Sequence, residues 1–443
     1  MLSLLILSPT ALWSLFSLCR WRHLYAWICA GVPLILWSLI LALYPQPQVE
    51  VWGPLCWSWD AVSGLFISLT VLLVTIVSLS STRSSRAFSG WIFLLESLLI
   101  LLFLARDGLS FFLGFEGVLI PLCALIAIWG GTNKYQAAWT LFLYTFIGTL
   151  GLWISSAFLY AHTGSFLWSV WHGYSASPWL WWGIFFACAV KLPLWPFHSW
   201  LPIVHVAAPT QGSMLLAGIV LKVGGYGLFR LMTDMLAISP PDMGRFVIQI
   251  SSLIAIFYGS LCAWGQNDLK RLVAYASVSH MGLVMLGLMA NSPLSTTGSL
   301  FLMISHGLIS AGLFWGVSRI QTLYGTRDLR EVSGLISASP RLTGILFLFI
   351  IGLIAVPGTM GFIGEFLIIY GLWSHAPWIS LCAAGGMVGS ALYGLRFCQC
   401  FWGKTPNLSS HRPIFPGRWV LALLGLSILG LGLFPHILLQ WIP

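Results

Sequence analysis

The sequence predicts an all-α polytopic membrane protein with about 14 transmembrane helices, and three observations lead to this fold class. Of its 443 residues, 58% are apolar and only 7% are charged, whereas about 25% of a typical soluble domain is charged. The 25 Trp, 28 Phe and 12 Tyr residues give far more apolar surface than a disordered chain has. Apolar runs of about 20 residues, the length that crosses a bilayer, recur along the chain. A soluble enzyme and a disordered protein are thereby excluded.

The apolar runs follow one another with short connections, so we expect a single membrane domain over residues 1–443. The predicted spans are 2–19, 24–44, 62–80, 88–105, 109–129, 136–160, 178–195, 208–232, 245–264, 272–290, 297–319, 342–371, 376–401 and 417–441. The first lacks a basic leader and is interpreted as a retained helix rather than a signal peptide. Residues 45–60 are expected to form an extended connection at the membrane surface.

The formal net charge of +9 indicates a membrane orientation, because basic residues collect in the cytoplasmic or matrix-side loops of membrane proteins. Most of the 20 Lys and Arg residues lie in or beside odd-numbered connections: Arg20, Arg22, Arg83, Arg86, Lys134, Lys270, Arg271, Arg319, Arg327, Arg330, Arg341, Arg396, Lys404, Arg412 and Arg418. The even-numbered connections hold only Arg106, Arg230 and Arg245. This asymmetry predicts both termini on the side opposite the cytoplasm or matrix.

Ionisable residues inside the predicted spans are candidate functional residues, because a charge there costs at least about 2.5–3.5 kcal/mol. They are Glu96, Glu116, Lys191, Lys222 and Glu365. His280 and His306 join them as groups that titrate near neutral pH. The sequence shows no nucleophile-and-base pairing or phosphate loop, and its 9 cysteines follow no zinc or disulfide pattern. We therefore predict a protein that moves charge.

Lys191 lies deep in its span and is followed by Pro193 and Pro196, which remove backbone donors and break the helix. Broken helices mark ion pathways in transporters. A carboxylate such as Glu116 facing a lysine lets both stay charged, and separating the two would release a proton from the lysine. For Lys191, the alternatives are a side chain that extends to the membrane interface and a permanent ion pair. For Lys222, the alternative is a fixed structural ion pair.

Glu365 follows a second proline break at Pro357, and paired breaks beside single buried charges indicate an inverted repeat. His280 and His306 are interpreted either as proton relays or as helix–helix hydrogen bonders. Glu96 is interpreted either as a relay or as a structural partner.

Two further features are interpreted as structural. The glycines of the run 224–227 are expected to permit close helix packing. Arg106 and Asp107 are adjacent at a predicted helix end, and we expect them to pair with each other at the interface.

Four motifs around these residues resemble the proton-translocating, antiporter-like membrane subunits of respiratory complex I. They are FEGVLIP around Glu116, KLPLWPFHSWLP from Lys191, HVAAPTQGSMLLAGIVLKVGGYG through Lys222 and NDLKRLVAYASVSHMGL through His280. The resemblance covers about residues 88–370 and is strongest to the group of subunits called chain 4 or subunit M.

The resemblance implies 14 transmembrane helices with two inverted five-helix repeats and broken helices 7 and 12. Helices 1–3 would occupy residues 2–80, the first repeat (helices 4–8) 88–232, the second repeat (helices 9–13) 245–401 and helix 14 417–441. It also implies a role for each buried group: Lys191 as the central lysine, Glu116 as its modulating glutamate, Lys222 as the connecting lysine, Glu365 as the carboxylate of the second broken helix, and His280 and His306 as members of the polar axis.

The resemblance implies no cofactor in this chain, since NADH, FMN, iron–sulfur clusters and ubiquinone bind to other subunits of the complex. The expected function is proton translocation coupled to NADH-to-ubiquinone electron transfer in those subunits. The expected partners are other membrane-arm subunits, including neighbouring antiporter-like ones, and membrane lipid, with no nucleic acid. We expect the mitochondrial inner membrane, with both termini on the intermembrane-space side; the alternative is a bacterial plasma membrane.

Two other functions fit parts of the same pattern. A subunit of a cation/proton antiporter or of a membrane-bound hydrogenase complex would carry the same motifs, and sodium-dependent transport would favour it. A scaffold would use the buried charges only to hold a membrane assembly together. In a scaffold, Lys191→Met and Glu116→Gln would assemble poorly.

Overall fold

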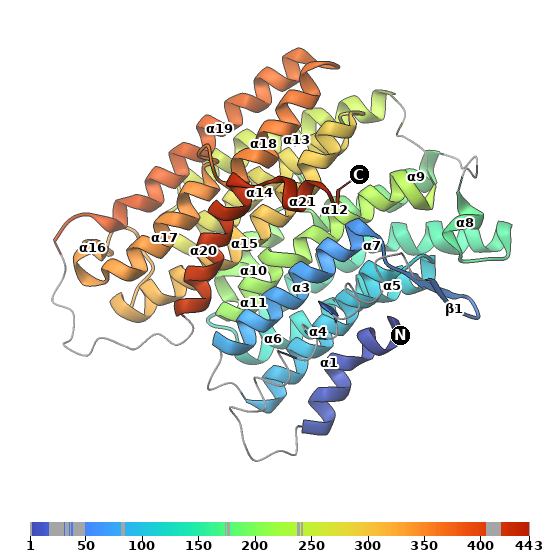
Figure 1. The fold of residues 1–443 in the computed structure, drawn as a ribbon, viewed down its shortest axis with the longest axis horizontal. Helices are drawn as coiled ribbons and strands as arrows, with labels where there is room; N and C mark the ends of the chain where they lie inside the picture. Colours follow the sequence, from blue (N-terminus) through green and yellow to red (C-terminus); the bar gives the residue numbers. More distant parts are fainter. Residues whose placement is uncertain are drawn as a thin grey trace. The chain divides into compact units, whose positions relative to one another are not determined.

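The computed structural model describes residues 2–16, 49–80, 85–172, 178–236, 242–404 and 418–442, with isolated positions at 31, 35, 37, 38, 174 and 240. These residues are mostly helical (Figure 1). The chain divides into two compact units. Unit 1 comprises residues 1–192 and 207–241, and unit 2 comprises residues 193–206 and 242–443. The predicted class, a helical membrane protein, is confirmed.

Unit 1 contains a hairpin and the helices of the N-terminal half. They are α1 (Leu2–Phe16), β1 (Val49–Trp52), β2 (Leu55–Ser58), α3 (Ala61–Ser80), α4 (Arg86–Leu104), α5 (Gly108–Gly117), α6 (Leu119–Trp129), α7 (Lys134–Thr163), α8 (Trp168–Trp171), α9 (Pro178–Lys191), α11 (Thr210–Leu215), η1 (Leu216–Val220), α12 (Leu221–Arg230) and η2 (Leu231–Met235). The segments η1 and η2 are π-helical turns that continue α11 and α12.

The regular elements in the described residues of unit 2 are all helices. Its elements are α10 (Trp200–Ala207, within the unit as far as Val206), α13 (Asp242–Trp264), α14 (Leu269–Leu288), α15 (Pro293–Tyr324), α16 (Leu335–Ala338), α17 (Pro340–Leu353), α18 (Met360–Trp373), α19 (Pro377–Cys398), η3 (Gln399–Phe401), α20 (Arg418–Leu433) and α21 (His436–Leu439). Helix α15 packs against α14, α17 and α18, and α13 packs against α14 and α19.

Within the described ranges, 9 helices are long and apolar enough to cross a membrane. They cover Ala61–Ser80, Arg86–Leu104, Gly108–Trp129, Lys134–Thr163, Thr210–Met235, Asp242–Trp264, Leu269–Leu288, Pro293–Tyr324 and Pro377–Phe401. Shorter apolar helices occupy the predicted spans at 2–19, 178–195, 342–371 and 417–441. Most of the predicted span at 24–44 lies outside the described residues.

The connection expected over residues 45–60 forms a two-stranded antiparallel hairpin from residue 49 onward, with Val49 opposite Ser58. Residues 45–48 lie outside the described part of the chain. Gly53 begins the two-residue turn with φ of 62°, a conformation that glycine adopts at no steric cost. The extended backbone is therefore confirmed from residue 49, with a turn that the sequence interpretation did not include.

A break separates α17 from α18 between Leu353 and Met360. Pro357 lies inside it and has no backbone N–H to continue the helix. Ala355 has φ of 53° and Gly358 has φ of 91°, so the backbone leaves the right-handed helical region on both sides of the proline. Glu365 lies one and a half turns into the second of the two helices.

The glycines at 224 and 227 let α12 lie close against α9, as expected from the sequence. A Cβ atom at Gly224 would lie 2.5 Å from the Cys188 carbonyl oxygen, and one at Gly227 would lie 3.0 Å from the Cys188 sulfur. Only a residue without a side chain fits at the first position. The last turn of α9, which ends at Lys191, is thereby held directly against the helix that carries Lys222.

An ion cluster in unit 1 ties the start of α3 to the ends of α4 and α12. Asp60 accepts from Arg230 at 2.6 Å and lies 3.1 Å from Arg106, and Asp234 accepts from Arg230 at 2.6 Å. Burial alone would raise the pKa of Asp60, but the two guanidinium groups hold it well below its usual value. The expected Arg106–Asp107 pair is wrong: Asp107 caps α5 instead, accepting from the Ser110 amide at 2.7 Å.

Candidate functional site

The predicted site residues form two groups, one in each unit. Glu96, Glu116, Lys191 and Lys222 belong to unit 1. His280, His306 and Glu365 belong to unit 2. Each group is described within its own unit.

Lys191 is the last residue of α9, and its side chain is 2% exposed. The helix ends there because Pro193 cannot donate a hydrogen bond to the Ala189 carbonyl. The ammonium donates to the Phe115 carbonyl and lies 4.0 Å from the centroid of the Phe115 ring. A backbone dipole and an aromatic face therefore stabilise the charged form of this buried lysine.

Glu116 follows Phe115 directly at the end of α5 and interacts electrostatically with Lys191. No ion pair within 4.0 Å joins the two side chains in the described structure, and the Oε1 atom of Glu116 is buried without a hydrogen-bond partner there. Helix α5 ends at Gly117, because Pro121 has no N–H to donate to the Gly117 carbonyl. The carboxylate therefore sits at a helix break, near Lys191 but not fixed to it.

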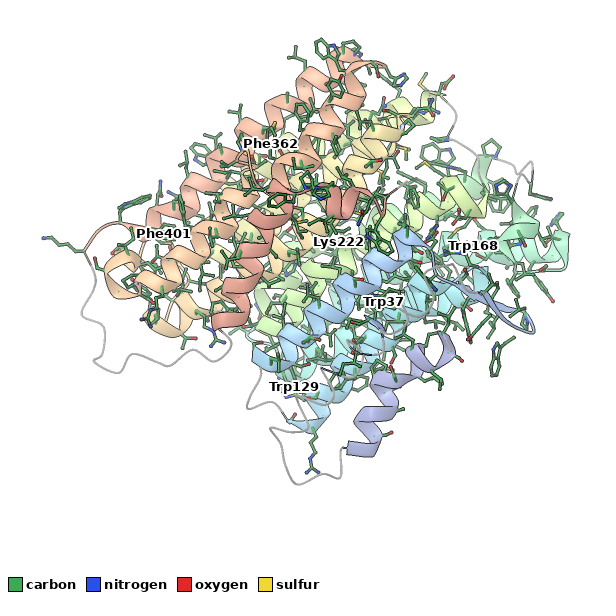
Figure 2. All side chains as sticks on the ribbon, in the orientation of Figure 1. Trp37, Trp129, Trp168, Lys222, Phe362 and Phe401 are labelled. Carbon is green, nitrogen blue, oxygen red and sulfur yellow. The ribbon has the colours of Figure 1, made fainter. Side chains whose placement is uncertain are left out.

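Lys222 lies at the second residue of α12, immediately after the π-helical segment η1. Its side chain is fully buried, and its ammonium donates to the Ala217 carbonyl. The wider π-helical turn aims that carbonyl at the lysine five residues later, and π-turns occur frequently at functional sites. Figure 2 labels Lys222 among the side chains of the green helices.

The helix face that carries Lys222 continues through Tyr226 to Arg230, at successive spacings of four residues. The Tyr226 hydroxyl donates to the Phe103 carbonyl at 2.8 Å, and its ring packs edge-on against Phe66 and Phe103. Arg230 lies 4.9 Å from the Tyr226 ring and joins the ion cluster at Asp60. Aromatic side chains therefore separate Lys222 from the charges at the helix end.

Glu96 lies on α4, is 1% exposed, and forms no ion pair with another described residue. Its Oε2 atom is buried without a hydrogen-bond partner in the described ranges. Glu96 therefore makes no ion pair with the described side chains, and its role as a relay or as a structural partner stays a prediction.

The second group is a hydrogen-bonded chain of three side chains from α14, α18 and α19. The Nδ1 atom of His280 lies 3.3 Å from the Glu365 Oε1 atom, and its Nε2 atom lies 2.9 Å from the Tyr393 hydroxyl. A neutral imidazole has one donor and one acceptor. If Nδ1 donates to the carboxylate, Nε2 accepts from the tyrosine, and protonation of the ring reverses the second hydrogen bond.

His306 on α15 stands beside this chain, with its ring centroid 5.4 Å from that of His280. Its Nε2 atom lies 3.1 Å from the Ser277 hydroxyl oxygen. That hydroxyl already donates to the Val273 carbonyl at 3.0 Å, so it can only accept from His306. This hydrogen bond ties the imidazole of His306 on α15 to α14.

Tyr393 is a site residue that the sequence analysis missed. It is fully buried on α19 and is the neighbour that the His280 imidazole contacts on the side away from Glu365. The available signal was a hydroxyl-bearing aromatic residue in the run GSALYGLRF, since a buried Tyr O–H usually has a partner. Nothing in the sequence connects it to His280, which lies 113 positions earlier.

Both groups bring titratable side chains together where water is scarce, and they contain no nucleophile beside a base. No cluster of three or more His, Cys, Asp or Glu that could hold a metal ion occurs in the described part of the chain. The arrangement suits storage and transfer of protons, because each group places a proton donor close to an acceptor.

Comparison with known proteins identifies relatives over most of the chain. Residues 105–392 match the family described as NADH:quinone oxidoreductase/Mrp antiporter, TM. Subunit M of the NADH-quinone oxidoreductase of Rickettsia bellii (strain RML369-C) is 36% identical over 395 residues, which are 86% of this chain and 80% of that protein. Chain 4 of the NADH-ubiquinone oxidoreductase of Chondrus crispus is 38% identical over 391 residues, 85% of this chain and 79% of that protein.

Solved structures give the same picture of the fold. A chain of respiratory complex I from Thermus thermophilus with bound NADH superposes with a TM-score of 0.91 and 27% identity, covering 100% of this chain and 97% of that one. A chain of the Mrp complex from Dietzia sp. DQ12-45-1b superposes with a TM-score of 0.86 and 19% identity, covering 99% and 94% of the two chains.

Proposed function

This chain belongs to the NADH:quinone oxidoreductase/Mrp antiporter family of membrane subunits, and we propose that it is a proton-translocating subunit in the membrane arm of a respiratory complex I. The observation that carries the proposal is its 36–38% identity, over most of both chains, to proteins named subunit M or chain 4 of that enzyme. The buried donor–acceptor groups of the two units supply the chemistry that such a subunit needs.

The finer architecture belongs to the same proposal: 14 transmembrane helices, with two inverted five-helix repeats and broken helices 7 and 12. The end of α9 at Lys191 and the break between α17 and α18 support it, since each lies beside one buried charge. The boundary between the two units at residues 241 and 242 supports a division between a first repeat over 88–232 and a second over 245–401.

In unit 1 we assign Lys191 as the proton carrier and Glu116 as the group that controls it. Burial disfavours the charged form of the lysine, and the Phe115 carbonyl, the Phe115 ring and the charge of Glu116 oppose that cost. Movement of the α5 end would carry the carbonyl and the carboxylate away together, because residues 115 and 116 are consecutive. The ammonium would then lose its stabilisation and release its proton. Lys222 receives the proton in this scheme, and Glu96 is assigned as an auxiliary relay.

In unit 2 the proton passes along Tyr393, His280 and Glu365, with His306 as a neighbouring acceptor. The imidazole of His280 can accept a proton at one nitrogen while giving one up at the other, since both nitrogens already face a partner. Glu365 is assigned as the group that receives the proton at the second broken helix. The direction of transfer is set by the rest of the complex.

The redox cofactors of such a complex, NADH, FMN, iron–sulfur clusters and ubiquinone, belong to other subunits in this proposal. The partners of this chain are other membrane-arm subunits, including antiporter-like neighbours. Relatives occur both in bacteria and in eukaryotes. We assign the mitochondrial inner membrane, with a bacterial plasma membrane as the second location.

Substitution of Lys191 tests the proposed carrier. Lys191→Met in the assembled complex is expected to lower NADH-driven proton pumping about a hundredfold, because a positioned proton-transfer group contributes roughly 10²–10⁴ in rate. Pumping is measured by quenching of a pH-sensitive dye in inside-out membrane vesicles. Lys404→Met, at an exposed lysine, is the matched control and should pump normally.

Glu116→Gln tests whether the charge of Glu116 controls proton release or only holds the assembly together. The amide keeps the shape but lacks the charge, so pumping should fall while assembly, measured on a native gel, stays intact. Poor assembly of both variants would favour the scaffold. Near-normal pumping by assembled Lys191→Met would contradict the assignment of Lys191.

A native gel of source membranes in mild detergent distinguishes complex I from the related transporters. This chain should migrate with a large band that stains for NADH dehydrogenase activity. Migration in a smaller band without that activity, together with sodium-dependent transport, would favour a cation/proton antiporter or hydrogenase complex, whose Mrp-type fold is shared.

A further inference from the structure

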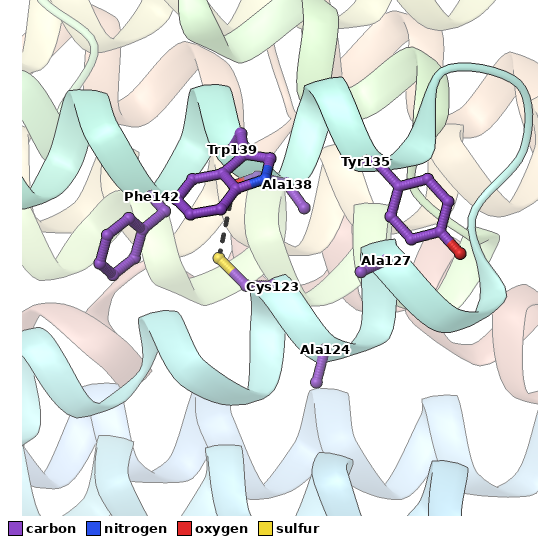
Figure 3. Close-up of a pocket in the computed structure, with 7 residues that line it drawn as sticks. All are labelled: Cys123, Ala124, Ala127, Tyr135, Ala138, Trp139 and Phe142. Atoms are coloured by element: carbon purple, nitrogen blue, oxygen red, sulfur yellow. Dashed lines mark hydrogen bonds between the residues drawn. The ribbon is translucent and has the colours of Figure 1, made fainter.

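An apolar groove opens between α6 and α7 of unit 1, within two predicted membrane spans. It has a volume of about 340 Å³ and is lined by Cys123, Ala124, Ala127, Tyr135, Ala138, Trp139 and Phe142 (Figure 3). Three alanines make the floor shallow, and the three aromatic rings form the walls. None of these residues belongs to the proton-transfer groups described above.

The groove is lined by no charged side chain and by no buried side-chain N or O atom that lacks a hydrogen-bond partner. The Cys123 thiol, the one polar hydrogen in its floor, is directed at the Ala138 carbonyl at 3.6 Å. Tyr135 and Trp139 are 67% and 62% exposed, so the walls are open to the surroundings of unit 1. In a membrane span, an open apolar groove of this kind accepts hydrocarbon.

One end of the groove is electropositive. Residues 127 and 135 lie next to the short connection 130–133, whereas residues 123 and 142 lie deeper in the spans. At the connection, the Lys134 ammonium folds over the end of α6, donating to the Ile128 carbonyl at 2.9 Å, and lies 5.4 Å from the Tyr135 ring. The groove therefore runs from a cation inward along the helices.

The N-terminus of α7 and the C-terminus of α6 meet at this end with opposite partial charges, so Lys134 supplies its net positive charge. Helix α7 is 30 residues long, has no acidic residue in its first turn, and its N-cap Asn133 makes no side-chain hydrogen bond to the first-turn amides. Such a helix start carries partial positive charge and attracts anions. Lys134 and the start of α7 thus lie at one end of the groove, and the groove extends from them into the membrane spans. A phospholipid has the same order, with a charged head group followed by acyl chains.

We propose that this groove, with Lys134 and the start of α7 as its head, is a binding site for an acidic glycerophospholipid of the bilayer. The phosphate group lies at Lys134, and one acyl chain lies in the groove between α6 and α7. The site is in the leaflet that meets the odd-numbered connections, where the basic residues of the chain are concentrated. It shares no residue with the proposed proton path.

Photolabelling of the purified complex in lipid vesicles tests the site. The probes are a phosphatidylglycerol and a phosphatidylcholine that carry the same diazirine-bearing acyl chain, and the labelled peptides are identified by mass spectrometry. The segment 119–142 should be labelled, about fivefold more by phosphatidylglycerol, the ratio expected for one basic residue near a membrane surface. Equal labelling by the two probes, or none in this segment, would overturn the proposal.

Two pairs of variants locate the head and the groove. Lys134→Gln should abolish the preference for phosphatidylglycerol, whereas Lys404→Gln, at an exposed lysine in unit 2, should leave it unchanged. Ala127→Trp should fill the groove and reduce labelling by both probes about tenfold, whereas Ile147→Trp, at a 64% exposed position elsewhere on α7, should not. If Ala127→Trp does not assemble, Lys134→Gln alone tests the site. A preference for phosphatidylglycerol that persists in Lys134→Gln would refute the proposal.

Discussion

The Tyr393 hydroxyl determines what the His280 imidazole can do with its second nitrogen. Because Glu365 occupies the Nδ1 side at 3.3 Å, the hydroxyl at 2.9 Å is the described partner of Nε2. The tyrosine can donate to a neutral ring or accept from a charged one, so one hydrogen bond serves both protonation states. The Nε2 atom of His280 therefore keeps a hydrogen-bond partner in both protonation states.

Tyr393→Phe removes that oxygen and keeps the ring. Proton pumping should fall about tenfold, because a buried nitrogen left without a partner costs about 1–3 kcal/mol and 1.4 kcal/mol is a factor of ten. Dye quenching in vesicles measures the pumping, and a native gel verifies assembly. Tyr370→Phe on α18, where the side chain is 61% exposed, is the matched control. Full activity in Tyr393→Phe would remove the tyrosine from the proposed path.

At the scale of elements, the close contact between α9 and α12 depends on the absence of a side chain at Gly224. Gly224→Ala should destabilise the protein by about 1–3 kcal/mol, since the added Cβ would lie 2.5 Å from the Cys188 carbonyl oxygen. A fall in the thermal unfolding midpoint measures this. Gly344→Ala on α17, with no atom within 4 Å of the added Cβ, should be neutral or slightly stabilising, because alanine favours helix. Equal effects of the two substitutions would refute the close contact.

The ion cluster at Asp60 joins elements that are distant in sequence, since Asp60 and Arg230 lie 170 positions apart. Asp60→Asn leaves the nearly buried Arg230 with Asp234 as its remaining described carboxylate partner. We expect a loss of about 1–3 kcal/mol at neutral pH, less than for a fully buried pair because the Asp60 side chain is 36% exposed. Asp328→Asn, whose partner Arg330 is exposed, is the control and should have no measurable effect.

The pH dependence of the same variant follows from the lowered pKa of Asp60. A carboxyl group whose pKa is lower in the folded state stabilises that state above its unfolded pKa, about 3.9. This contribution is lost as the pH falls below that value and through the folded pKa. The difference in thermal midpoint between the parent and Asp60→Asn should therefore be constant from pH 7 to 5 and shrink below about 4. A constant difference down to pH 3 would contradict the charged pair.

At the scale of the molecule, features set by short-range sequence were predictable and features set by distant contacts were not. Span positions follow from the apolar length that a bilayer demands, and the helix end at Lys191 follows from Pro193. The π-helical turn before Lys222 has no local signal, because it depends on the packing of buried helices around it. Tyr393 contacts His280, and Asp60 accepts from Arg230, and each partner lies more than 100 positions away in the sequence. Short-range sequence patterns could therefore not predict these contacts.

The orientation of the whole chain in its membrane rests on the asymmetry of its basic residues, and the two ends of α19 offer a direct test. His375 precedes this helix in an even-numbered connection, Lys404 follows it in an odd-numbered one, and both residues are exposed. A helix that spans the bilayer must present these positions on opposite sides. The positive-inside rule further predicts Lys404 on the cytoplasmic or matrix side.

His375→Cys and Lys404→Cys should therefore react with a membrane-impermeant maleimide from opposite sides of oriented vesicles. In inside-out vesicles, whose outer surface is the former cytoplasmic or matrix face, Lys404→Cys should be labelled and His375→Cys protected until detergent is added. The parent protein, which contains Cys382 and Cys398 within α19, gives the background. Labelling of both positions from one side would show that α19 does not span. The reverse pattern would place the basic connections, and with them the head of the proposed lipid site, on the opposite face.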